Sequence, residues 1–163
     1  MDVDADEVIK RLRNDRFVRE PLRVALNKVG RMGETDSKRR APVDFGRLRA
    51  AITHQVDDQP MMLSVDIGVI GKSGELPYAK YMEYGTGLTH DHPSWPRRVH
   101  MVPVSALANW GPVRRNLVSA GAVATSITKR GGLKPRRYLR GMLEDNSGNF
   151  IAIIKRAVKE MEL

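Results

Sequence analysis

The chain has 163 residues, enough for one domain with a modest hydrophobic core, and its 41% hydrophobic and 29% charged residues are typical of a globular protein. It contains no cysteine, which excludes disulfide bonds and thiolate metal sites. The net charge of +9 favours polyanionic partners, either nucleic acid or an acidic protein surface. An aromatic content of only 6% argues against a single-strand binder built on base stacking.

No stretch approaches the run of roughly 20 apolar residues that spans a bilayer, so no membrane contact is expected. The first seven residues are acidic and lack the basic-then-apolar order of a secretion signal. The sequence therefore indicates a protein that is made, and works or assembles, in the cytoplasm.

Two apolar-periodic segments come first. Asp4 or Asp6 can cap a helix that carries Val8, Ile9 and Leu12 on one side. Pro21 suits the first position of a second helix, or the bend in a single helix that includes both segments. The second segment presents one apolar stripe, made of Leu22, Ala25, Leu26, Val29 and Met32.

Residues 33–41 are polar and lack any period, which predicts an exposed loop. Asp44 follows and is placed to cap a short helix whose inward residues are Leu48, Ala51 and Ile52.

The pattern then changes to period two. Ile52, His54 and Val56 alternate with polar residues, and a turn is expected at residues 57–60. A second alternating segment, with Leu63, Val65, Ile67 and Val69, is the clearest strand in the chain. The two segments predict an antiparallel hairpin.

The second half of the chain predicts short helices between irregular segments. A tyrosine-rich helical turn ends at Gly85, residues 87–103 form an extended loop, and a short helix from Ser105 stops at Gly111-Pro112. A small-residue helix over 119–129 ends at Gly131-Gly132. After a break at residues 146–148, a long final helix turns these residues inward: Phe150, Ile151, Ile154, Val158 and Met161.

These elements predict an α+β fold in one domain over residues 1–163. A small antiparallel sheet is flanked by N-terminal and C-terminal helices, with a helical insertion before the last segment. Strands do not alternate with helices as in parallel βαβ units, which argues against a nucleotide-binding α/β fold.

Sequence motifs that would indicate a catalytic, metal or phosphate-binding site are weak. The only grouping that resembles metal ligands is His90, Asp91 and His92 with His100, and no cysteine or helical spacing supports it. The Gly-Lys-Ser at residues 71–73 lacks the spacing of a phosphate loop. Glu83 lies among three tyrosines, but a structural hydrogen bond or ion pair is favoured over a catalytic role. The sequence therefore predicts neither an enzyme nor a cofactor or metal site.

Basic clusters are the strongest chemical feature. The densest runs from residue 129 to residue 140, and solvated or paired charges explain it better than contact with DNA phosphates, although both remain open. Its candidate DNA-channel or inter-subunit residues are Lys129, Arg130, Lys134, Arg136, Arg137 and Arg140.

Three motifs occur in order along the chain: residues 41–52 (APVDFGRLRAAI), residues 78–87 (YAKYMEYGTG) and residues 134–140 (KPRRYLR) before a final helix. Together they resemble the neck or tail-completion proteins of long-tailed bacteriophages, the virion morphogenesis group related to the lambda minor tail protein Z. Residues 104–131 are similar to an insertion common in that group, and the resemblance covers about residues 5–160. The departures are Phe45 where a small hydroxyl residue is usual, Tyr138 where Phe is usual, and Gly111-Pro112 inside the insertion.

The resemblance implies a structural virion protein that forms a ring at the head–tail junction and joins the tail to the DNA-filled head. A hexamer is favoured and a dodecamer is the alternative. Expected partners are neighbouring connector or stopper proteins, tail terminator or tail tube proteins, and packaged DNA through non-specific contact. The loops over 33–41 and 87–103 are expected to reach neighbouring subunits, and the isolated protein is expected to be monomeric or heterogeneous.

The resemblance assigns structural or interface roles to a set of motif residues, within which we expect an Arg47–Glu83 ion pair, buried or between subunits. Loss of one partner from such a buried pair costs on the order of 3–5 kcal/mol. Two other functions stay open beside the neck protein: a tail terminator ring and a basic nucleic-acid-binding module unrelated to virions. The motif residues are Val43, Asp44, Gly46, Arg47, Leu48, Tyr78, Tyr81, Glu83, Tyr84, Gly85, Pro135 and Leu139.

Overall fold

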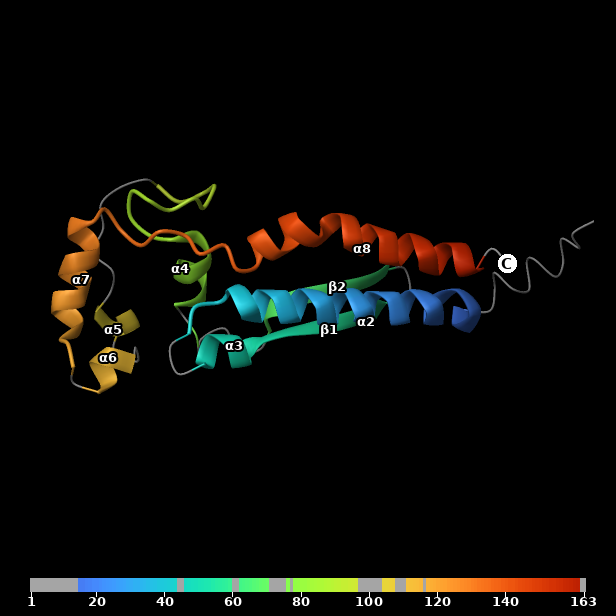
Figure 1. The fold of residues 1–163 in the computed structure, drawn as a ribbon, viewed down its shortest axis with the longest axis horizontal. Coiled ribbons are helices and arrows are strands. Elements are labelled where there is room, and N and C mark those ends of the chain that lie inside the picture. The colour runs from blue at the N-terminus through green and yellow to red at the C-terminus, as the bar shows by residue number, and fades with distance from the viewer. Residues whose placement is uncertain are drawn as a thin grey trace, which may run out of the picture.

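The computed structural model describes residues 15–43, 46–59, 62–70, 76, 78–96, 104–107, 111–115 and 117–161. Within them, the predicted α+β fold is confirmed: a two-stranded antiparallel sheet has helices before and after it. The molecule is elongated, as Figure 1 shows, with the hairpin and the two long helices in one half, α4 in the middle and α5 to α7 at the other end. None of the described helices is both long and apolar enough to cross a bilayer.

Helix α2 (Asp15–Arg40) is the longest element and continues through Pro21. Pro21 therefore lies inside a helix and not at its first position, as the alternative prediction placed it. Residues 8–12 of the first segment lie outside the described residues, so a single helix that includes both segments stays a prediction. Ala25 and Val29 of the predicted stripe are buried. Residues 22–32 thus present one apolar face, as the 3.6-residue period requires.

The predicted loop over residues 33–41 is wrong, because α2 continues to Arg40. Two acid–base pairs at i,i+4 spacing, Glu34–Lys38 and Asp36–Arg40, stabilise the last two turns. The small residues Gly33 and Ser37 face the rest of the protein; a Cβ on Gly33 would lie 2.5 Å from Cδ1 of Ile67. These turns are polar because ion pairs and close packing hold them instead of large apolar side chains.

Helix α3 (Arg47–Ala51) leads directly into the hairpin of β1 (Ile52–Gln59) and β2 (Met62–Val69), which confirms the predicted antiparallel pair. The register places Ile52 opposite Val69 and Gln59 opposite Met62. Residues 57–59, expected in the turn, are therefore part of β1. One face of the sheet packs against α2, where Nδ1 of His54 lies 2.5 Å from Oε2 of Glu34.

Helix α8 (Arg140–Met161) runs antiparallel to α2, as Figure 1 shows. The predicted break at residues 146–148 is wrong, since the helix is continuous there. The Asn146 side chain donates to Oδ2 of Asp36 and to the Met142 carbonyl, each at 2.9 Å, and so anchors this turn. Phe150 is buried, but Ile151 and Val158, expected inward, are 53% and 40% exposed.

The short helices of the second half are α4 (Ala79–Tyr84), α5 (Val104–Leu107), α6 (Gly111–Arg114) and α7 (Ala120–Lys129). Gly111-Pro112 begins α6, which fits the preference of proline for a first helical turn. Ser119 caps α7 by accepting the Ala122 N–H, and Gly131 follows it with positive φ, as the sequence predicts. The described part of the predicted 87–103 loop, residues 87–96, is irregular.

Candidate functional site

The three motifs meet in one hydrophobic cluster. Leu48 and Ile52 come from the first motif, Ala79 from the second and Tyr138 from the third, and all four are buried. Burial raises the pKa of the Tyr138 hydroxyl, which donates to the Ala79 carbonyl at 3.3 Å. Segments up to about 90 residues apart along the chain therefore share a single core.

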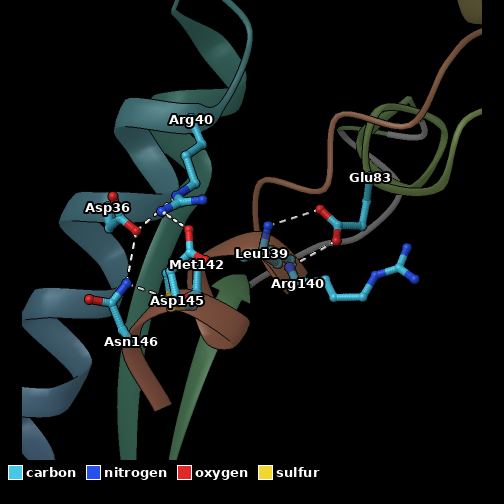
Figure 2. Close-up of polar contacts among 8 residues, drawn as sticks. All are labelled: Asp36, Arg40, Glu83, Leu139, Arg140, Met142, Asp145 and Asn146. Atoms are coloured by element: carbon cyan, nitrogen blue, oxygen red, sulfur yellow. Dashed lines mark hydrogen bonds and ion pairs between the residues drawn. The ribbon is translucent and has the colours of Figure 1, made fainter. Parts of the chain in front are cut away.

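Glu83 joins the second motif to the third, as Figure 2 shows. Its side chain is 4% exposed, and its two carboxylate oxygens accept the backbone N–H groups of Leu139 and Arg140, each at 2.9 Å. These donors lie at the start of α8, where N–H groups have no partner within the helix and the helix dipole favours a negative charge. A carboxylate on α4 therefore caps α8.

The backbone just after Glu83 also contacts the segment that precedes α8. The Thr86 N–H donates to the Leu133 carbonyl at 2.9 Å, and the Leu133 N–H donates back to Oγ1 of Thr86. The two segments lie so close that a Cβ on Gly132 would be 1.9 Å from the Thr86 carbonyl oxygen, and one on Gly85 would be 2.4 Å from that of Leu133. Glycine is required at both positions, which also have positive φ.

Asp91 completes the connection. Its carboxylate accepts from Nε of Arg137 and from Nη2 of Arg140, each at 2.7 Å. Burial raises the pKa of Asp91, but the hydrogen bonds from the two guanidinium groups outweigh it, so the pKa lies below its ordinary value. Arg137 has a left-handed φ of 49°, a strained conformation held by this ion pair and by its N–H bond to the Glu83 carbonyl. We call these contacts of Glu83, Thr86 and Asp91 with residues 131–140 the α4–α8 clasp.

A second anchor lies one turn along α8. Nη2 of Arg40 contacts Oδ2 of Asp145 at 2.8 Å, and its Nε contacts Asp36, also at 2.8 Å (Figure 2). The hydrogen bond to Asp145, the largest influence, raises the pKa of Arg40. The start of α8 is therefore fixed both to α4 and to the end of α2.

Aromatic side chains cover α4. Trp95 stacks on His92 at a ring-centroid distance of 4.3 Å and lies 5.9 Å from Tyr81 and from Tyr84. Sequence reasoning missed Trp95, although a tryptophan in a polar, proline-rich stretch is a signal that the segment folds onto something apolar. Residues 87–96 are thus packed against α4.

The Arg47–Glu83 ion pair is wrong as a buried pair within the chain, and its alternative form, between subunits, stays a prediction. Arg47 is exposed, and no ion pair joins the two residues in the described part of the chain. Glu83 instead forms a structural hydrogen bond to backbone donors, the class of role that the sequence favours over catalysis. Gly46 is the residue before α3 and has a φ of 72°, while Asp44, expected to cap this helix, lies outside the described residues.

The remaining motif residues divide by exposure. Leu48 is buried, Val43 is 65% exposed, and Tyr78 and Leu139 pack at the edge of the shared cluster. The first motif thus contributes to the core mainly through its helix. Pro135 is half-buried beside Gly85, where its ring nitrogen would lie 2.9 Å from an added Cβ.

The six basic candidates also divide. Arg137 and Arg140 pair with Asp91 and are therefore part of the clasp. Lys129, Arg130, Lys134 and Arg136 are exposed and form no ion pair with a described residue. We call these last four side chains the basic segment.

The histidines do not meet as ligands in the described part. His90 is 3% exposed with its Nε2 3.3 Å from the Pro96 carbonyl, and Nδ1 of His92 accepts the Ser94 N–H. His100 lies outside the described residues, among which no group of three or more His, Asp or Glu could hold a metal ion. The contacts of His90 and His92 are those of packed loop residues.

Compared with protein-family models, curated proteins and solved structures, the chain gives no match. The resemblance to neck proteins therefore rests on the three motifs.

We predict that Glu83→Ala lowers the free energy of unfolding by at least about 2 kcal/mol, because two backbone donors lose their acceptor and each costs roughly 1–3 kcal/mol when buried and unpaired. Urea unfolding followed by circular dichroism measures this. Glu144→Ala, an exposed acid on α8, is the matched control and should stay within about 0.5 kcal/mol of wild type. Equal stability of the two variants would contradict the capping role.

Asp91→Asn should lower stability at pH 7 by about 1–3 kcal/mol, the usual range for hydrogen bonds to charged groups. Since the pKa of Asp91 is depressed in the folded protein, its contribution is present above the unfolded pKa of about 4 and is lost as pH falls through the folded value. The difference in the free energy of unfolding between wild type and variant should therefore shrink as pH falls below about 4. A constant gap between pH 7 and pH 3 would show that the charge of Asp91 does not matter.

Proposed function

We propose that the chain is a structural, non-catalytic virion protein of a tailed bacteriophage, a subunit of a ring at the head–tail junction that joins the tail to the DNA-filled head. The observation that carries this proposal is that the three motifs that resemble those of neck proteins contribute to one core, and that the second and third are joined by the clasp, although they lie far apart in the sequence. This shared core supports the interpretation of the three motifs as one structural unit.

The shape of the molecule supports an assembling subunit. Large apolar side chains are exposed along α8 and in the insertion, among them Leu117 at 67%, Leu143 at 55% and Ile151 at 53%. Exposed apolar surface of this extent is typical of contacts with other proteins. We expect six copies, or twelve in the alternative, with connector or stopper proteins and tail terminator or tail tube proteins as neighbours.

Particles of the parent phage made without this protein should accumulate as full heads and separate tails in electron micrographs. Addition of the purified protein should join them. Heads that fail to fill, or heads and tails that join normally, would contradict the proposal. Tails of uncontrolled length would instead favour the tail terminator, the closest alternative.

A basic nucleic-acid-binding module is the second candidate, and the basic segment favours it, because four exposed cations without acidic partners among the described residues suit DNA phosphates. The neck function predicts weak, sequence-blind duplex binding or none. The module predicts submicromolar binding with a steep salt slope. Filter-binding titrations at two salt concentrations separate the two.

Alanine at all four positions of the basic segment should reduce the salt slope by roughly 0.9 for each phosphate that the protein no longer neutralises, if the segment meets DNA. The control replaces Lys155 and Lys159, two exposed cations on α8, with alanine. The control removes two charges and the variant removes four, so a reduction in the control about half as large as that in the variant, equal for each charge removed, would mean that only net charge matters.

A further inference from the structure

Two apolar surfaces on α8 have no partner among the described residues. One is a groove between α2 and α8, lined by apolar residues that include Val24, Met32 and Ile153. The other, which we call the outer stripe, consists of Leu143, Ile151, Ile154 and Val158; three of these are at least 40% exposed and Ile154 is half-buried. The protein therefore presents a concave and a convex apolar surface.

The two surfaces face different ways. At 3.6 residues per turn, most groove residues of α8 and the outer stripe are centred roughly 160° apart around the helix axis. Their lengths are similar: the groove follows α2 from Glu20 to Met32, about 18 Å, and the stripe follows α8 from Leu143 to Val158, about 22 Å. A ridge and a groove of matched length on opposite sides of one molecule allow copies to associate head to tail.

Charges indicate the orientation. The cations Lys28 and Arg156 line the middle of the groove. The acids Glu20 and Glu160 line the end of the groove near the C-terminus of α8, and Glu20 also contacts Arg23. Beside the outer stripe, Glu144 lies near the start of α8 and Lys155 near its end, both exposed. Suppose that the α8 of a second copy lies in this groove. If it runs parallel to the α8 that lines the groove, its Glu144 lies toward the cations and its Lys155 toward the acids. The antiparallel orientation brings like charges together, which disfavours it.

We propose that the occupant of the groove is the outer stripe of a second copy of this chain, packed parallel to the resident α8. Such a contact is heterologous, so each copy keeps a free groove on one side and a free stripe on the other, and repetition closes a ring or extends a filament. The inference rests on the proposed function only in that a ring needs a contact of this kind.

Disulfide trapping tests the contact, with no background because the chain has no cysteine. Val24→Cys and Ile151→Cys are both at exposed positions, so both variants should fold. Differently tagged and mixed under mild oxidation, they should give at least about tenfold more crosslinked heterodimer than Val24→Cys mixed with Leu117→Cys. The double variant should give a ladder of oligomers.

Three results would overturn the proposal. Efficient homodimers of Ile151→Cys alone would mean that two stripes pair about a twofold axis. Preferential coupling of Val24→Cys to Leu12→Cys would mean that the N-terminal residues occupy the groove. A yield of crosslinked heterodimer no higher than that of the control would mean that the groove and the outer stripe do not meet. Because the test uses purified protein without virions, its failure would leave the head–tail joining result standing.

Discussion

The buried carboxylate of Glu83 is the contact on which the arrangement of this protein depends. It lies on a helix of six residues, too short to be stable alone, yet it accepts both N–H groups at the start of the 22-residue α8. The same helix end is held from the other side by Arg40 through Asp145. Since α8 and α2 pack along their length, fixing the first turn of α8 fixes the position of the whole helical layer relative to α4 and the segments that follow it.

Patterns of apolar side chains predicted the elements in which burial follows a simple period. The hairpin was predicted because Leu63, Val65 and Ile67 alternate with polar residues, and the stripe of α2 because Ala25 and Val29 recur at helical spacing. Residues 33–40 could not be predicted in this way, since their helix is held by ion pairs and by close approach of Gly33 to the hairpin. Likewise Asn146 and Gly148 read as a break, but a hydrogen bond to Asp36, far away in sequence, keeps the helix continuous.

The site was predictable as a set of motifs but not as a set of contacts. Glu83 could be singled out for a structural role, whereas its partners could not be named, because a backbone N–H group has no sequence signature. An arginine is the obvious partner for an acid in a basic protein. Arg47 of the first motif was the predicted partner, but it is exposed. The arginines that are used, Arg137 and Arg140, pair with Asp91, an acid whose position between two histidines suggested metal ligation instead.

The division of the basic residues follows from this clasp. Arg137 and Arg140 are needed to hold residues 131–140 against α4, so of the six basic candidates only the four of the basic segment, at the end of α7 and on the connection to α8, remain for external partners. Three of the exposed large apolar side chains in the described part of the chain, Leu143, Ile151 and Val158, lie on α8, the helix that the clasp orients. One set of internal contacts therefore decides both which cations face outward and how the outer stripe is presented, and a change in the clasp would alter the two surfaces together.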